Sequence, residues 1–174
     1  MRRLADEILI PAETIASRVV ELAREIERET PPDGEIAALI VLKGAFVFGA
    51  DLLRAIRRPT RVGFLEIHRQ SDDGGEVEFV FTHPFPIEGR DVLVIEDILD
   101  TGVTMNALLD RLRARRPARL RTAVLLDKRS RRQVECPVEH VGFEIPDRWV
   151  VGYGLDDDEL YRNLPGIGWV VENP

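Results

Sequence analysis

The sequence has little cysteine, lysine and histidine, and these shortages limit the chemistry that it offers. Cys136 is the single cysteine of 174 residues, so no disulfide forms within the chain, and three scattered histidines complete no zinc motif. A reducing compartment, the cytoplasm, is therefore expected. Of 24 basic residues only Lys43 and Lys128 are lysine, and the other 22 are arginine. Genome composition and thermal adaptation both stay open as sources of that bias.

The chain also lacks long apolar runs and a surplus of positive charge. No stretch approaches the roughly 20 apolar residues that span a bilayer, so we expect no membrane association. The formal net charge of -7 argues against broad nucleic-acid binding, which generally needs a basic surface. With 44% hydrophobic and 32% charged residues, the whole chain, residues 1–174, is expected to form one globular domain.

Strand and helix patterns alternate along the chain. Apolar periodicity predicts helices over residues 12–29, after Gly44, and around residues 105–112. Apolar runs of strand length cover residues 36–42, 62–67, 91–95 and 120–126, and residues 76–81 alternate like a hairpin strand. Because strands that alternate with helices pair in parallel, we expect an α/β fold with a doubly wound, mainly parallel sheet of about five strands. Ligands of such sheets bind at the carboxyl ends of the strands.

The densest polar cluster follows the apolar run at residues 92–95. It contains three carboxylates, two hydroxyls and a glycine at an expected strand-to-helix turn: Glu96, Asp97, Asp100, Thr101, Thr104 and Gly102. A helix start offers unpaired backbone N–H groups and a positive dipole end to a phosphate. The alternative is an ordinary N-cap by Asp or Thr, which needs no ligand. Two adjacent carboxylates, however, repel unless solvent, hydroxyls or a cation lies between them. Neither a Walker A motif nor G-x-G-x-x-G occurs.

Residues 92–104 resemble the signature with which type I phosphoribosyltransferases bind phosphoribosyl pyrophosphate (PRPP). Further stretches resemble the hypoxanthine-guanine branch of that family: residues 42–45, 125–129, 141–147, 152–156 and 161–164. The resemblance implies a type I phosphoribosyltransferase-like fold with a small hood, which we expect both chain ends to build. It also implies purine salvage, in which hypoxanthine, guanine or both react with PRPP to give IMP or GMP and pyrophosphate, with Mg²⁺ as cofactor.

The resemblance assigns PRPP and its metal to three groups of residues. Glu96 and Asp97 would hold the ribose hydroxyls and assist Mg²⁺, which Asp156 would bind through water. A second group would cradle the 5-phosphate: Asp100, Thr101, Gly102, Val103 and Thr104. A third group would hold pyrophosphate: Lys43, Gly44 and Arg162. The Leu42-Lys43 peptide is expected to be cis.

The base site is also implied by resemblance. Asp100 would act as general base or acid at purine N7 while N9 attacks the anomeric carbon. Lys128 would donate a hydrogen bond to the 6-oxo group, and because an ammonium has donors only, the 6-amino group of adenine should be rejected. Trp149 would stack on the base, and the main chain of Val150 would read its edge.

The chain departs from the family pattern after residues 62–67. Many members carry a Ser-Tyr pair on a closing loop, and this chain has Arg69-Gln70 there. Two readings of Arg69 have equal weight, contact with pyrophosphate and an exposed loop residue. Residues 69–76 are expected to be poorly ordered without ligand. Residues 157–159 are read as a solvated helix start, and the three histidines as surface or core residues.

Three matters stay open at this point. The family commonly forms dimers and tetramers, so a homodimer or homotetramer is expected. Base preference among hypoxanthine, guanine and xanthine is not settled by sequence. The alternative functions are a xanthine or other nucleobase phosphoribosyltransferase, or a PRPP-sensing or RNA-binding regulator on the same fold.

Overall fold

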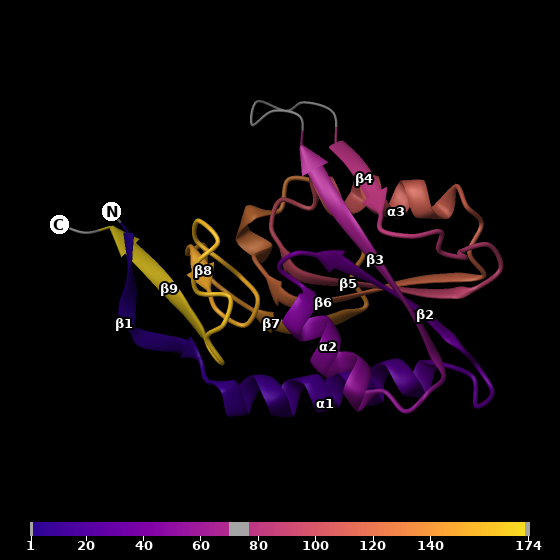
Figure 1. Cartoon of the computed structure of the whole chain (residues 1–174), viewed down its shortest axis with the longest axis horizontal. Helices are drawn as coiled ribbons and strands as arrows, with labels where there is room; N and C mark the ends of the chain where they lie inside the picture. The colour runs from indigo at the N-terminus through magenta and orange to yellow at the C-terminus, as the bar shows by residue number, and fades with distance from the viewer. Residues whose placement is uncertain (1, 70–76, 173–174) are drawn as a thin grey trace.

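The computed structural model describes residues 2–69 and 77–172, and its larger sheet has the strand order β4-β3-β2-β5-β6-β7 (Figure 1). The strands are β2 (Ile36–Leu42), β3 (Thr60–Arg69), β4 (Val77–Phe81), β5 (Asp91–Leu99), β6 (Arg119–Asp127) and β7 (His140–Glu144). Five of them are parallel, and β4 pairs antiparallel with β3 at one edge. The predicted mainly parallel sheet and the hairpin strand are confirmed.

Helices cover both faces of this sheet. Helices α1 (Ala12–Glu29) and α2 (Phe46–Ala55) lie below it in Figure 1, and α3 (Val103–Arg113) lies above it. Because side chains of a strand alternate between faces, Ala38 and Ile40 join the core under α1 and α2, whereas Leu39 and Val41 join the core under α3. This double cover explains why β2 reads as a continuous apolar run.

Strand β5 is longer than its apolar run. The sequence predicted that the strand ends at Ile95 and that Glu96 and Asp97 lie in a turn. This prediction is wrong, because the strand runs to Leu99. The strand continues because its parallel ladder with β6 extends through Ile98 and Leu99. The two acidic residues therefore have strand backbone, and the turn to α3 begins only at Asp100.

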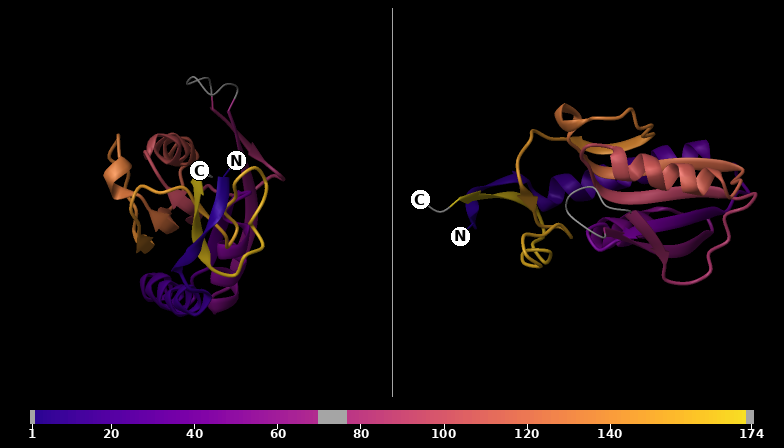
Figure 2. Two further views of the ribbon diagram at one scale, coloured as in Figure 1. Left: turned by 90° about the vertical axis from the view of Figure 1, so that its left-hand side faces the viewer. Right: turned by 90° about the horizontal axis from the view of Figure 1, so that it is seen from above.

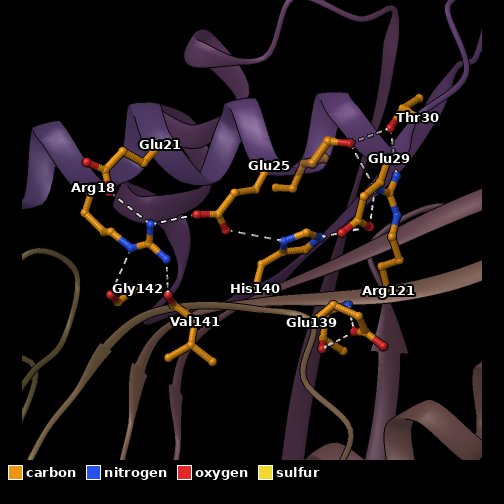
Figure 3. Close-up of polar contacts among 12 residues, drawn as sticks. Arg18, Glu21, Glu25, Glu29, Thr30, Arg121, Glu139, His140, Val141 and Gly142 are labelled. Atoms are coloured by element: carbon orange, nitrogen blue, oxygen red, sulfur yellow. Dashed lines mark hydrogen bonds and ion pairs between the residues drawn. The ribbon is translucent and has the colours of Figure 1, made fainter.

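A buried charge network fastens α1 to the sheet (Figure 3). Arg121 on β6 is 1% exposed, and its Nη2 lies 2.7 Å from Asp91 Oδ2 and 3.0 Å from Thr30 Oγ1. Its Nη1 donates to the carbonyl of Ile26 at 3.1 Å. A buried guanidinium is tolerated only when it is paired in this way.

His140 on β7 is the second buried member of this network. Its Nδ1 lies 3.8 Å from Glu25 Oε2, and its Nε2 lies 3.6 Å from Glu29 Oε2, both on α1. Burial lowers the pKa of His140, which outweighs the attraction of the two carboxylates. His140 is 1% exposed. Of the two roles expected for the histidines, surface or core, it therefore has the core role.

Both chain ends form a second, three-stranded sheet, which is the hood. Its order is β1 (Arg2–Ile10), β9 (Ile167–Glu172) and β8 (Val150–Val151), and both pairings are antiparallel. The two termini lie side by side beyond the carboxyl edge of the larger sheet (Figures 1 and 2). The expected hood is thus confirmed. None of the helices within the described residues has the length and apolar character needed to cross a membrane.

Candidate functional site

The carboxyl end of β5 and the start of α3 line a cavity of about 730 Å³. The lining combines the end of the strand, the loop and the neighbouring β2 turn: Glu96–Gly102, Thr104, Met105, Val41, Leu42, Gly44, Ile67 and Arg131. The polar cluster singled out from sequence therefore faces one open space. This is the edge at which ligands of parallel sheets bind.

Glu96 and Asp97 form an electrostatically strained pair. Burial raises the pKa of both carboxyl groups, and the neighbouring charge of Asp97 raises the pKa of Glu96 further. Asp97 is fixed by its own strand, because its Oδ1 accepts a hydrogen bond from the backbone N–H of Ile98 at 2.7 Å. Two carboxylates held together in this way favour a partner that carries hydroxyl donors or positive charge.

The turn into α3 is shaped to receive an anion. Gly102 is the N-cap, with a φ of 84° that an L side chain rarely adopts, and no side chain caps the helix. Thr101 Oγ1 is 3.4 Å from the N–H of Val103, which is a weak contact. The alternative of an ordinary Asp or Thr N-cap is therefore not realised, and the helix start presents backbone donors to the cavity.

A second cavity, of about 510 Å³, lies between the β2–α2 turn and the segment that connects β8 to β9. It brings together Lys43, Gly44, Asp156 and Arg162, as the resemblance implied. Arg162 Nη2 lies 2.9 Å from Asp156 Oδ1, and its Nη1 donates to the carbonyl of Gly154 at 2.8 Å. The Leu42-Lys43 peptide is cis, as predicted.

Glu159 also reaches this second cavity, which corrects its reading as part of a solvated helix start. Residues 157–159 form turn and bridge structure without a helix, because Asp158 and Glu159 have positive φ angles of 53° and 63°. Glu159 lies 3.3 Å from Lys43 Nζ and 3.2 Å from Arg162 Nη2. Lys43 and then Arg162 lower the pKa of Glu159. An acidic side chain thus occupies the space between the two cations.

The third cavity, of about 240 Å³, lies under the hood. Its lining includes the side chains proposed from sequence for the base: Asp100, Lys128, Trp149, Val150 and Asp156. Lys128 and Val150 are buried, whereas Trp149 is 53% exposed. A cavity walled by an indole, with a buried ammonium at one side, suits a planar heterocycle that carries an acceptor.

Asp97 lines all three cavities, so they meet at one carboxylate. The residues proposed for the 5-phosphate, for pyrophosphate and for the base lie respectively around the first, second and third cavity. One ligand with three such parts could therefore contact all of them at once. Each sequence-derived site residue except Val103 lines at least one cavity, and Val103 opens helix α3 beside them.

Sequence reasoning missed two arginines at the same site. Arg131 Nε donates to Asp100 Oδ1 at 2.9 Å, and Arg132 Nη1 donates to the main-chain oxygen of Asp100 at 2.7 Å. No local signal marks them among 22 arginines, because their partner lies about 30 residues away in the chain. The expectations for residues 70–76 and for the side chain of Arg69 lie outside the described residues.

Comparisons with known proteins agree with this arrangement. Residues 7–158 match the phosphoribosyl transferase domain family. The chain is 42% identical to the hypoxanthine-guanine phosphoribosyltransferase of Aquifex aeolicus, over 96% of this chain and 95% of that protein. The Bacillus anthracis hypoxanthine-guanine phosphoribosyltransferase structure has a TM-score of 0.92 and 40% identity, and covers 99% of this chain and 100% of its own.

A structure of the Trypanosoma cruzi hypoxanthine phosphoribosyl transferase has a TM-score of 0.90 and 36% identity, covering 97% of this chain and 93% of its own. That structure concerns the role of the C-terminal region in its oligomeric state and enzymatic activity.

Proposed function

Because the chain belongs to the hypoxanthine-guanine phosphoribosyltransferase family, we propose that it joins hypoxanthine, guanine or both to the ribose 5-phosphate of PRPP and releases pyrophosphate. This reaction salvages a free purine as IMP or GMP. The observation that carries the proposal is the meeting of three cavities at Asp97. They match in number and in chemistry the three parts that must come together: 5-phosphoribosyl group, pyrophosphate and base.

The first cavity binds the ribose 5-phosphate. The 5-phosphate accepts hydrogen bonds from the backbone of residues 101–104 and from the hydroxyls of Thr101 and Thr104. Asp100 and Val103 belong to the same loop and helix start. The carboxylates of Glu96 and Asp97 accept hydrogen bonds from the two ribose hydroxyls, which also relieves the strain of this acidic pair.

The second cavity binds pyrophosphate. Lys43, the backbone at Gly44 and Arg162 supply positive charge and donors for it. The contacts of Glu159 support this role, because they show that Lys43 and Arg162 already attract an anionic group into the space between them. Pyrophosphate carries more charge than one carboxylate and replaces it there.

The third cavity binds the base. The buried ammonium of Lys128 donates to the 6-oxo group, Trp149 stacks on the ring, and the main chain of Val150 reads the opposite edge. Asp100 lies at the boundary between the first and third cavities, where it can take the proton from N7 as N9 attacks the anomeric carbon. The same carboxyl group returns a proton in the reverse reaction.

The acidic residues of the site fit a Mg²⁺ ion that protein and substrate hold together. Within the ranges 2–69 and 77–172, no three acidic, cysteine or histidine side chains are grouped to hold a metal by themselves. Mg²⁺ is usually held by one or two carboxylates together with waters and substrate phosphates. We assign Glu96, Asp97 and, through water, Asp156 to it. When bound, Mg²⁺ neutralises charge on the departing pyrophosphate.

The whole chain, residues 1–174, then acts as one transferase domain, and we propose a cytoplasmic homo-oligomer. The family match over residues 7–158 supports the first point. The Trypanosoma cruzi relative, whose structure addresses its own oligomeric state, supports the second. Sedimentation of the purified protein at several concentrations tests it, and a single monomeric species at all of them would contradict the oligomer.

Formation of IMP from hypoxanthine, PRPP and Mg²⁺, followed by absorbance, tests the function. Guanine, xanthine and adenine are assayed in parallel, and we expect hypoxanthine or guanine to give the highest kcat/KM. Asp100→Asn should lower turnover about 10²–10⁴-fold because it removes the proton acceptor and keeps the shape, with PRPP affinity preserved. Transfer to none of the four purines would overturn the proposal, and unchanged turnover of Asp100→Asn would remove Asp100 as the base.

A further inference from the structure

Two consecutive arginines contact Asp100, one at its side chain and the other at its main chain. Arg131 Nε donates to its carboxylate oxygen Oδ1 at 2.9 Å, and Arg132 Nη1 donates to its main-chain oxygen at 2.7 Å. We propose that Arg131 is a positioning residue of the transfer reaction, which fixes the Asp100 carboxylate toward purine N7, while Arg132 fixes the loop beneath it. This inference rests on the function proposed above, in which Asp100 is the general base.

The guanidinium of Arg131 also contacts Asp147, which links Asp100 to Lys128, the residue proposed to bind the base. Arg131 Nη1 lies 3.3 Å from Asp147 Oδ2, and Asp147 Oδ1 lies 3.9 Å from Lys128 Nζ. N7 and the 6-oxo group are neighbours on one edge of a purine. Asp100 and Lys128 address these two atoms, so the chain through Arg131 and Asp147 sets the spacing between the two groups that read that edge.

The contact leaves one oxygen of Asp100 for chemistry. The hydrogen bond from Arg131 Nε goes to Oδ1 of the carboxylate and not to Oδ2. Arg131 therefore orients the base without occupying the oxygen that takes the proton from N7.

The backbone places Arg131 with little freedom. It ends a short 3₁₀ helix, η1 (Arg129–Arg131), which follows directly after Lys128. The segment is tied at both ends to the residues that flank Asp100, since the N–H of Lys128 donates to Leu99 O and the N–H of Gln133 donates to Thr101 O, each at 2.9 Å. Arg131 thus moves with the loop that carries Asp100.

Arg129 offers a matched control on the same short helix. Its side chain is 76% exposed, and its nearest acidic partner is Glu144 at 3.9 Å. It has the same residue type and almost the same position in the chain as Arg131, yet lines none of the three cavities. A general effect of removing one positive charge from this segment appears equally in both variants.

A competing role for Arg131 is direct contact with PRPP, since it lines the first cavity. The two roles separate kinetically. A residue that binds PRPP changes the KM for PRPP, whereas one that acts through the general base changes the rate of the chemical step. Single-turnover rates with enzyme in excess report that step without interference from product release.

The experiment measures the single-turnover rate of IMP formation and the KM for PRPP. Arg131→Gln should slow the chemical step about two- to fivefold, because an ion pair between half-exposed side chains contributes a factor of up to about five. Its KM for PRPP should stay within about twofold of wild type. Arg131→Lys should recover part of the rate, since lysine keeps the charge and loses the planar fork. Arg129→Gln should match wild type.

A double-mutant cycle decides whether Arg131 acts through Asp100. In the Asp100→Asn background, Arg131→Gln should cause no further slowing, because coupled residues are non-additive. Equal slowing in both backgrounds, a raised KM for PRPP as the only change, or a rate equal to that of Arg129→Gln would each overturn the proposal. Inactive wild-type protein would instead refute the proposed function. If Arg131→Gln does not fold, Arg131→Lys serves in the same cycle.

Discussion

Replacing Gly44 with alanine should damage the site through one steric overlap. Gly44 lies between β2 and α2, and a Cβ added there would stand 1.6 Å from Asp97 Oδ2 and 2.6 Å from its Cγ. Ordinary contact begins near 3.4 Å. Glycine is required at this position because of close approach, and the carboxylate that approaches is the one shared by all three cavities.

The structure sets the size of the effect. To accept the methyl group, Asp97 or the 43–45 turn must move by about 1.8 Å. Asp97 cannot rotate away freely, because its Oδ1 holds the N–H of Ile98 at 2.7 Å. Since a displacement of about 1 Å at a reacting centre can cost about 10² in rate, Gly44→Ala should lower kcat/KM at least about 10²-fold, or about 2.7 kcal/mol.

The assay is steady-state IMP formation, with circular dichroism to verify folding. Gly168→Ala on β9 is the matched control, because its added Cβ would meet only the end of the Leu4 side chain, at 3.2 Å. That variant should keep its kcat/KM within about threefold, as a small adjustment of a flexible side chain absorbs the contact. A folded Gly44→Ala protein with kcat/KM within threefold of wild type would refute the steric argument.

Three further variants test the electrostatics of the site and the core. Lys128→Ala should reduce kcat/KM for hypoxanthine and guanine far more than the residual rate with adenine, and an equal loss for all three would contradict its role. Because burial lowers the pKa of His140, the unfolded chain takes up a proton that the folded chain resists, so stability should fall as pH drops below about 6.5. Urea midpoints at pH 7.5 and 5.5 should therefore differ more for wild type than for His140→Asn, and equal differences would argue against the mechanism. Because burial and then Asp97 raise the pKa of Glu96, its ionised form destabilises the ligand-free fold above that pKa. Glu96→Gln should accordingly raise the melting temperature at pH 7.5 by about 1–8 °C while lowering activity, and a lower melting temperature would contradict this reasoning.

The sheet and the position of the polar cluster at residues 96–104 could be predicted from sequence because their signals are local. The strand at 36–42 is apolar throughout since it is covered on both faces, and the cluster at 96–104 is contiguous. The extension of β5 to Leu99 was hidden because Glu96 and Asp97, which line a cavity, interrupt the apolar run before Ile98 and Leu99 resume it. An interrupted apolar run reads as the end of a strand although the strand continues.

The remaining site residues had no local signal at all. Glu159 reaches Lys43 in a segment where Asp158, Glu159 and Tyr161 adopt positive φ angles. Positive φ angles at residues other than glycine cannot be predicted from composition. Arg131 meets Asp100 across 31 positions, and in an arginine-rich chain its residue type carries no information. Such contacts depend on how the loops after β5, β6 and β7 converge, which is settled by tertiary packing.

The pairing of β1 with β9 bears on how the protein is made. Leu4 and Val170 are partners although 166 positions separate them, so β1 emerges from the ribosome long before the strand that completes it. Such distant closure is slow, and an unpaired strand can meanwhile recruit another chain. Two arginines, an aspartate and a glutamate in the first seven residues discourage that association. Charged residues in β1 therefore oppose pairing with another chain until β9 is available to pair with β1.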